Sequence, residues 1–247
     1  MLGQGASGVV LKAKVHGGFE VAVKKVQKEL EKEIDILKKC KHPNIVAYYG
    51  TKLTTDQVWI IMDYCGLGSV KDVMKLINRS LSEPEIQYVL RHTVTGLNYL
   101  HQIPILHLDI KAPNILMTES GDVKLADFGV SKQLSQSEEN LKATSYVGSP
   151  LFMAPEVIAK AEYNHKADIW SLGITIIEMA EFNPPNLDIR SIEQLPLIIE
   201  RDPPRFQSPE AWSPLFNEFL SICLVKDISL RPGCDTLLEH EFLNPPE

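Results

Sequence analysis

The 247-residue sequence lacks several features that would place it outside the ordinary soluble globular proteins. Its most apolar stretch, Ile169–Ala180, contains Ser171, Thr175 and Glu178 and is too short to span a bilayer. It has no excess of positive charge: a net charge of −7 argues against non-specific nucleic-acid binding, which requires a basic surface. We therefore expect neither membrane insertion nor a nucleic-acid partner.

Cysteine is also scarce, and its placement excludes two further classes. The four cysteines lack the paired close spacing of a zinc site or a disulfide framework. With no secretory segment at the start of the chain, scattered thiols of this kind predict a reducing, cytoplasmic compartment.

The order of the sequence patterns predicts two unlike lobes, which the length of the chain also favours. The first sixty residues favour strands: Val9–Leu11 and Val21–Val23 flank a Gly17-Gly18 hairpin signal, and Val58–Met62 is a further apolar run. Between them, Leu30, Ile34 and Leu37 recur at helical spacing.

Helical patterns dominate after Gly68. Ser82 followed by Glu83-Pro84-Glu85 predicts the start of a helix that runs to about His101. The segment Ile169–Ala180 is apolar nearly all round and predicts the central helix of the second lobe. We expect an α+β fold with a β-rich lobe at residues 1–62, a connector at 63–68 and a larger helical lobe at 69–247.

The segment from Leu2 to Val10 contains Gly3, Gly5 and Gly8 in the pattern G-x-G-x-x-G-x-V. Such glycines let backbone N–H groups approach phosphates without a Cβ clash. Alone the pattern is weak, because a glycine-rich hairpin is often only a turn. Here β-branched residues follow the third glycine, which favours a β-hairpin lid over a dinucleotide-binding turn.

Val21-Ala22-Val23-Lys24 places a lysine at the end of an apolar strand. In isolation a solvated lysine is the better interpretation, but after a glycine loop its ammonium can reach the phosphates of a nucleotide. Its flexible stem needs an acid to fix it. We expect Glu33 to be that acid, because Leu37 lies one turn later on the same helix face.

A second group of polar residues lies at Asp109, Lys111, Asn114 and Asp127. Turn chemistry alone explains many such Asp and Asn pairs, but two apolar runs, Ile115–Met117 and Val123–Ala126, separate the loop from Asp127-Phe128-Gly129. Asn114 and Asp127 are then candidate Mg²⁺ ligands. Asp109 is the candidate for orienting an attacking hydroxyl and taking its proton, and Lys111 for offsetting charge on a transferred phosphoryl group.

These motifs, in this order over nearly the whole chain, resemble the eukaryotic protein kinases. The segments Trp59–Val70, Leu125–Val130, Gly148–Ile158 and Ala167–Ile174 are most similar to the sterile-twenty-like group, especially its germinal-centre and Hippo-type branch. The resemblance implies a bilobal ATP- and Mg²⁺-dependent serine/threonine protein kinase in intracellular signalling, with protein substrates and a possible upstream activator or scaffold. Lys111, two residues after Asp109, carries the serine/threonine rather than the tyrosine pattern.

The resemblance also implies roles for individual residues. Glu156 should pair with Arg231, Asp168 should hold the catalytic loop through its backbone, and the Ser149 hydroxyl should bridge Asp109 and Lys111. Met62 should be the gatekeeper, with the hinge Asp63–Cys65 bonding adenine through its backbone. The implied nucleotide-binding set is Leu2, Gly3, Gly5, Gly8, Val10, Ala22, Lys24, Met62, Asp63, Cys65 and Leu116. Val10, Ala22 and Leu116 should sandwich the adenine ring, and Leu37, Tyr48, His107 and Phe128 should stack between the lobes. For these seven residues and Met62 the alternative is ordinary core packing, and the sequence alone does not separate the two.

The sequence departs from the family pattern in three places. Leu108 stands where the family usually has an arginine that receives the activation-loop phosphate, so we expect activity to depend less on phosphorylation at Thr144 or Ser145. The chain begins at the glycine loop, so we expect a first strand that lacks its leading half. Lys24 and Glu33 are closer in sequence than is usual, which leaves Glu29 and Glu31 as competitors for the pairing role.

Two rival functions follow from these departures. A pseudokinase, which binds ATP or nothing and activates a partner allosterically, is favoured slightly by Leu108, the short spacing between Lys24 and Glu33 and the incomplete first strand. Retention of Lys24, Asp109, Lys111, Asn114 and Asp127 argues against it. A small-molecule kinase of similar fold is disfavoured by the peptide-docking segment 148–156.

Overall fold

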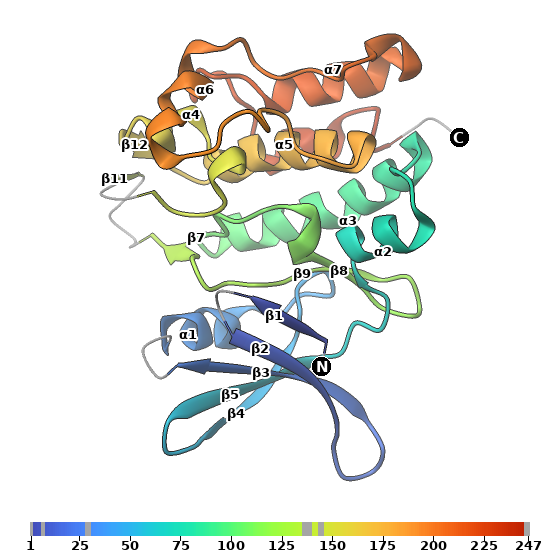
Figure 1. Ribbon diagram of the computed structural model, residues 1–247, viewed down its shortest axis with the longest axis vertical. Coiled ribbons are helices and arrows are strands. Elements are labelled where there is room, and N and C mark those ends of the chain that lie inside the picture. The colour runs from blue at the N-terminus through green and yellow to red at the C-terminus, as the bar shows by residue number, and fades with distance from the viewer. Residues whose placement is uncertain (1, 6–7, 28–30, 135–139, 143–145, 245–247) are drawn as a thin grey trace.

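The smaller lobe is a five-stranded antiparallel sheet with one helix beside it (Figure 1). A computed structural model describes residues 2–5, 8–27, 31–134, 140–142 and 146–244. The strand order is β1-β2-β3-β5-β4. The elements are β1 (Gly3–Gly5), β2 (Gly8–Lys14), β3 (Glu20–Gln27), α1 (Glu31–Lys39), β4 (Tyr48–Leu53) and β5 (Gln57–Asp63).

The expected strands and hairpin of this lobe are confirmed. β2 and β3 pair from Val9↔Lys25 to Lys14↔Glu20. The turn between them uses Gly17 and Gly18 at φ +96° and +85°, a backbone conformation that glycine adopts without strain. The α1 stripe is confirmed at Ile34 and Leu37, which are buried while Asp35 and Lys38 are exposed. Leu30 lies outside the described residues.

The larger lobe is mainly helical, so the expected α+β fold is confirmed. Its α-helices are α2 (Val70–Ile77), α3 (Glu83–Gln102), α4 (Pro155–Ile158), α5 (Lys166–Glu181), α6 (Pro196–Glu200), α7 (Pro214–Cys223) and α8 (Cys234–Glu239). Short strands accompany them: β6 (Gly68–Ser69), β7 (Ile105–Leu106), β8 (Ile115–Met117), β9 (Val123–Leu125), β10 (Lys132–Gln133), β11 (Leu141–Lys142) and β12 (Glu162–Tyr163).

Local signals explain how the two long helices begin and where they lie. Ser82 is the N-cap of α3: its N–H donates to Glu85 Oε2 at 2.7 Å, which is the bond that the acid supplies in a capping box, and its hydroxyl donates to the same oxygen at 2.8 Å. α5 is buried from Ala167 to Ala180, which confirms it as the central helix. A helix that is apolar nearly all round has no face to give to water, and α2, α3 and α7 pack against it.

The β8–β9 hairpin brings the two candidate metal ligands together. Ile115 pairs with Leu125 at the open end of the hairpin, so Asn114, just before β8, lies beside the chain that leaves β9 towards Asp127. The N–H of Ala126 donates to the carbonyl of Asn114 at 2.9 Å. β9 also contacts the smaller lobe, because the N–H of Val46 donates to the Leu125 carbonyl at 3.0 Å.

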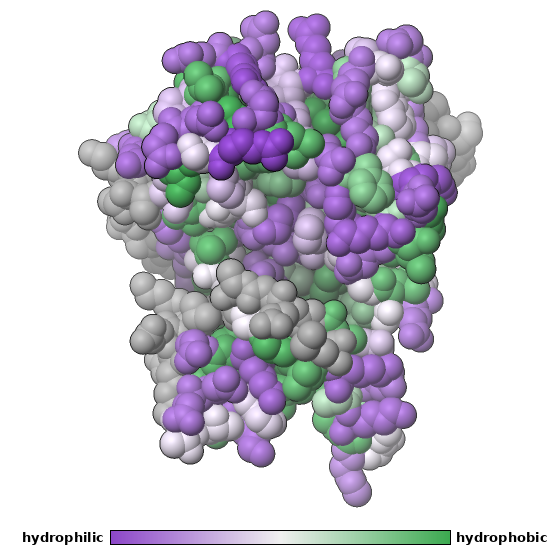
Figure 2. Space-filling view, in the orientation of Figure 1, coloured by the Kyte–Doolittle hydropathy of each residue, from purple (hydrophilic) through white to green (hydrophobic). Residues whose placement is uncertain are grey.

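On the face drawn in Figure 2, hydrophilic side chains cover most of both lobes, and hydrophobic ones reach the surface in small groups between them. Within the described ranges, no helix combines the length and the apolar character that crossing a bilayer demands.

Candidate active site

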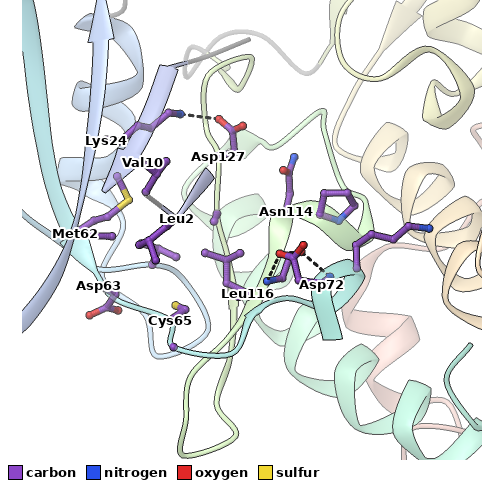
Figure 3. A pocket seen from close by; sticks show the side chains of 18 of the residues that line it. Leu2, Val10, Lys24, Met62, Asp63, Cys65, Asp72, Asn114, Leu116 and Asp127 are labelled. Atoms are coloured by element: carbon purple, nitrogen blue, oxygen red, sulfur yellow. Dashed lines mark hydrogen bonds and ion pairs between the residues drawn. The ribbon is translucent and has the colours of Figure 1, made fainter. Parts of the chain in front are cut away.

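A cavity of about 470 Å³ lies where the two lobes meet (Figure 3). Most of the residues predicted from the sequence to bind a nucleotide or a metal line it: Leu2, Gly8, Val10, Ala22, Lys24, Met62, Asp63, Cys65, Asn114, Leu116 and Asp127. Gly3 and Gly5 lie in β1, opposite Val10 and Gly8 of β2. Ala6 and Ser7, within the same glycine motif, lie outside the described residues.

One end of the cavity is apolar and suits a flat ring. Val10 and Ala22 come from the sheet of the smaller lobe, whereas Leu116 comes from β8 of the larger one. Val46, Cys65 and Ala126 form a small buried cluster against which Met62 and Leu116 pack. A planar aromatic ligand would therefore be held between aliphatic side chains of opposite lobes.

The hinge supplies backbone groups at this end. The N–H of Asp63 is already used, because it donates to the Ala47 carbonyl at 3.0 Å. The carbonyl of Cys65 accepts from Gly68 at 3.1 Å, but its N–H bonds to no acceptor in the described part of the chain. Adenine presents adjacent donors and acceptors, so the Cys65 N–H is the group best suited to bind it.

The other end of the cavity is ionic. Lys24 Nζ lies 2.9 Å from Asp127 Oδ1, and Figure 3 shows the two side chains pointing towards each other from opposite lobes. Burial alone would raise the pKa of Asp127, but the Lys24 ammonium offsets this and holds the pKa below its ordinary value. Asp127 is therefore an anion at neutral pH, as a metal ligand must be.

The predicted pairing of Lys24 with Glu33 cannot be placed. Glu33 and Glu31 lie in α1 but their side chains are outside the described ones, as is the whole of Glu29. Leu37, which was the reason for choosing Glu33 because it lies one turn later on the same helix face, lines the cavity. The choice of Glu33 stays a prediction.

Asp109 is the centre of a dense polar network. Its Oδ1 accepts the N–H of Ser149 at 2.9 Å and the Ser149 hydroxyl at 2.8 Å. Its Oδ2 lies 2.9 Å from Lys111 Nζ and accepts Asn114 Nδ2 at 2.8 Å. Lys111 also donates to the Ser149 hydroxyl at 2.6 Å, so the bridge expected at Ser149 is present.

This network keeps Asp109 ionised. Burial would raise its pKa, but the Lys111 ammonium and the Ser149 hydroxyl together bring the pKa below the ordinary value. Asn114 uses its amide nitrogen on the Asp109 carboxylate and on the Asp109 carbonyl, both at 2.8 Å. Its side-chain oxygen is therefore the group left to face a cation.

Two glycines are required by close backbone contacts. A Cβ on Gly8 would lie 2.1 Å from the Lys25 carbonyl oxygen, and one on Gly148 would lie 2.1 Å from that of Leu108. Both have positive φ, +134° and +91°. Gly148 thus lets the segment carrying Ser149 approach the loop carrying Asp109, which the Ser149–Asp109 bonds require.

Deeply buried charges hold this arrangement in place. Asp168 accepts the N–H groups of His107 and Leu108 at 2.9 and 2.7 Å, as the resemblance implied. The implied pair of Glu156 with Arg231 is also present, with both carboxylate oxygens bonded at 2.7 and 3.0 Å. His107 and Phe128 lie with ring centres 5.0 Å apart, and Leu37 and Phe128 belong to the main hydrophobic cluster, which Tyr48 packs against.

Leu108 is buried in the main hydrophobic cluster. Its φ of +64° is unusual for a bulky residue, and it directs the N–H towards Asp168. Its aliphatic side chain offers no group for a phosphate. The two residues that would be phosphorylated, Thr144 and Ser145, lie outside the described residues.

Sequence reasoning missed the part of the site contributed by α2. Ser69, Lys71, Asp72 and Lys75 also line the cavity. Ser69 caps the helix reciprocally with Asp72: the Asp72 N–H donates to the Ser69 hydroxyl at 3.1 Å, and the Ser69 N–H to the carboxylate at 3.0 Å. The spacing S-x-x-D just after the hinge is a capping signature that could have located this helix start.

The cavity fits a nucleotide with a hard divalent cation. Its apolar end and the Cys65 N–H suit adenine, and its ionic end suits phosphates. Among the described residues, no group of three or more His, Cys, Asp or Glu side chains is placed to hold a metal ion. A cation held by Asn114 and Asp127 would therefore take its other ligands from phosphates and water, as Mg²⁺ prefers.

Comparison with known proteins agrees with this geometry. The family model described as "Protein kinase domain" matches residues 1–243. The chain is 51% identical to the serine/threonine-protein kinase pakE of Dictyostelium discoideum over 98% of its own length and 27% of that protein. It is 47% identical to the serine/threonine-protein kinase 4 homolog A of the same organism, spanning 54% of it. It is 46% identical to the serine/threonine-protein kinase cst-1 of Caenorhabditis elegans, spanning 50% of it.

A family match over nearly the whole chain, with the fold and cleft described above, defines the class. The chain belongs to the protein kinase family. Its relatives carry the names of serine/threonine kinases, and the resemblance to the sterile-twenty-like group is confirmed. The chain spans between about a quarter and about half of the length of these three relatives.

Proposed function

We propose that this chain transfers the γ-phosphoryl group of ATP, bound with Mg²⁺, to serine and threonine hydroxyls of proteins. The observation that carries the proposal is the cleft lined by Lys24, Asn114 and Asp127 from both lobes. Asp109 and Lys111 do not line it but join it through the bond from Asn114 to the Asp109 carboxylate and the ion pair of that carboxylate with Lys111. When bound, ATP supplies the phosphoryl group that is transferred, and Mg²⁺ supplies the positive charge that holds the phosphates.

Each residue has a defined task. Lys24 binds phosphate oxygens and Asp127 and Asn114 bind the cation. Asp109 orients the acceptor hydroxyl and takes its proton as the oxygen bonds to phosphorus and the bond to ADP breaks. Lys111 offsets charge on the transferred group. Because both reactants lie in one cleft, the transfer is direct and needs no covalent intermediate on the enzyme.

The proposal extends to the setting of the reaction. We infer action in cytoplasmic signalling on protein substrates, under an upstream activator or scaffold. The names of the relatives, which are serine/threonine-protein kinases, support protein substrates, and the free thiol state of the four buried cysteines supports a reducing compartment.

The test compares wild type with Asp109→Asn and Asp127→Asn. Each variant should lose about 10³-fold or more of labelled-phosphate transfer to a generic basic protein, because proton acceptance or the metal charge is removed. Phosphoamino-acid analysis of the product should give phosphoserine and phosphothreonine. Thermal unfolding of each variant near the wild-type midpoint would show that the fold is intact.

Mg-ATP binding distinguishes the pseudokinase rival. A chain that is stabilised by Mg-ATP in a thermal shift assay but transfers no phosphate would be a scaffold and not an enzyme. Transfer that persists in both asparagine variants would contradict the assigned roles.

A further inference from the structure

The carboxylate of Asp63 joins three separate parts of the chain at the end of the hinge strand β5. Its Oδ2 accepts the N–H of Ala47 at 3.0 Å and lies 3.0 Å from Lys124 Nζ. Its Oδ1 accepts the hydroxyl of Tyr49. Burial would raise the pKa of Asp63, but these donors bring it below its ordinary value. In Figure 3 this carboxylate lies on the opposite side of the cavity from Asn114, one of the two candidate metal ligands.

An irregularity in the sheet directs Tyr49 to this carboxylate. β4 and β5 pair at Tyr48↔Met62 and then at Gly50↔Ile61, so Tyr49 is an extra residue in the ladder. A β-bulge of this kind turns a side chain away from the direction that regular alternation would give it. Regular pairing would not aim the Tyr49 hydroxyl at Asp63.

Lys124 reaches Asp63 from the other lobe. It lies in β9 directly opposite Leu116 of β8, and residues opposite each other in an antiparallel pair share a face. Leu116 lines the floor of the cavity on that face. Lys124 therefore rises towards the hinge beside the floor of the nucleotide site, and its side chain is only 16% exposed.

The same strand is fixed to the smaller lobe by backbone bonds. Leu125 N–H donates to the Asn44 carbonyl at 2.9 Å, and Val46 N–H donates to the Leu125 carbonyl at 3.0 Å. Asn44 Nδ2 donates to the Val123 carbonyl at 3.0 Å. β9 leads directly to Asp127, so these bonds connect the hinge with the metal-binding end of the cleft.

We propose that Lys124, Asp63 and Tyr49 form a hinge clasp, a set of positioning residues that fixes the distance between the adenine-binding hinge and the phosphate-binding Asp127. The inference rests on the proposed function, because it assigns a nucleotide to the cleft. A nucleotide must contact Cys65 at one end and Asp127 at the other. Its affinity is highest when both ends are already at the correct separation.

The clasp has a specific kinetic signature. Lys124→Met removes the charge that joins β9 to the hinge but touches neither the acceptor site nor Asp109. We expect about a tenfold rise in the Kd and KM for Mg-ATP, which corresponds to about 1.4 kcal/mol, with kcat at saturating ATP nearly unchanged. Tyr49→Phe removes one hydrogen bond from the same carboxylate and should raise the same constants by a smaller factor.

The experiment measures Mg-ATP binding by titration calorimetry, steady-state kinetics and urea unfolding on the same preparations. Lys124→Arg, which can still donate to Asp63, should restore most of the affinity. Arg79→Met is the matched control, because it removes an ion pair with Glu85 of 2.8 Å that lies within one lobe. It should leave the Kd for Mg-ATP unchanged.

The possible outcomes separate the clasp from the proposed function. Wild-type affinity in both Lys124→Met and Tyr49→Phe would overturn the clasp alone, as would an equal fall in kcat, stability and affinity that Lys124→Arg does not rescue. If Lys124→Met fails to fold, the Tyr49→Phe affinity decides. A wild-type chain that binds no Mg-ATP would overturn the proposed function and this inference with it.

Discussion

The charged groups of the cleft and those buried in the larger lobe form similar ion pairs but differ in their access to the cavity. In the cleft, Asp127 keeps 34% of its side-chain surface exposed beside a nearly buried Lys24. In the larger lobe, Asp168 and the Arg231 guanidinium are both fully buried. A charge that faces a cavity can exchange its partner for a ligand, whereas one enclosed by protein cannot.

The buried charged groups also have most of their hydrogen-bonding atoms occupied by protein partners. Asp168 accepts His101 Nε2 and two backbone N–H groups, and Arg231 donates to Glu156 and to the carbonyls of Val225 and Lys166. These partners are set by the fold. The comparison indicates that the buried Asp168 holds the catalytic loop and that the buried Glu156–Arg231 pair joins distant segments of the larger lobe. The ion pairs of the cleft instead keep part of their surface exposed to a ligand.

The largest effect on stability should come from breaking a buried pair. Arg231→Met leaves the Glu156 carboxylate without its partner, and the loss of such a pair typically costs about 3–5 kcal/mol of unfolding free energy. Urea denaturation at pH 7 measures it. The exposed Arg79–Glu85 pair provides the contrast, since Arg79→Met should produce no resolvable loss. Equal losses in the two variants would remove the distinction between buried and exposed pairs.

The opposite result is expected in the cleft. Ser149→Ala removes the hydroxyl that joins Lys111 to Asp109, which should lower kcat by about tenfold, or about 1.4 kcal/mol, with little change in the unfolding midpoint. Steady-state kinetics at saturating Mg-ATP measures the effect. Ser149→Thr keeps the hydroxyl and should retain most activity. If Ser149→Ala lost stability without losing rate, Ser149 would have a structural role like that of the buried Arg231 and would not contribute to catalysis.

The pH dependence of the rate should be weak on the acid side. The pKa values of Asp109 and Asp127 both lie below the ordinary value of about 3.9 for this side chain. The ionised, active forms are therefore present above that range and are lost only as the pH falls through the lowered values. We expect kcat to stay flat from about pH 8 to about pH 6. An inflection in that window that moves to higher pH in Ser149→Ala would show that Asp109 titrates there and that the network does not bring its pKa below the ordinary value.

The smallest effect should follow removal of phosphate from the activation loop. Leu108 is buried among apolar side chains and cannot form the charge-assisted pair that an arginine forms with a phosphate. Phosphatase treatment should change kcat by less than about threefold, under about 1 kcal/mol. A large loss of rate that is absent from a Thr144→Ala/Ser145→Ala double variant would contradict this expectation.

Local patterns predicted β2, β3, β5, the β8–β9 hairpin and the helices α1, α3 and α5, because each depends on neighbours in the sequence. The Gly17-Gly18 turn, the Ser82 cap and the central, buried position of α5 were confirmed on these grounds. The grouping of Asn114 with Asp127 also followed from sequence, because two short strands joined by a turn return the chain to its starting point.

Other features of the site depend on contacts that no local pattern records. The side-chain role of Asp63 was missed because its partners come from residues 47, 49 and 124, and one of them arrives through a β-bulge. The contribution of α2 to the cleft was missed for a related reason. Its capping signature fixes where the helix starts but not which cavity it faces.

The sequence by itself determined the family, the chemical types of the reactive side chains and the order of the elements, because spacing and residue type are properties of a chain. Only the tertiary structure decided which ion pairs face the cleft and which are enclosed, and which carboxylate joins the hinge to the other lobe. Those outcomes depend on burial and on distances between segments far apart in sequence, which arise only when the two lobes pack against each other.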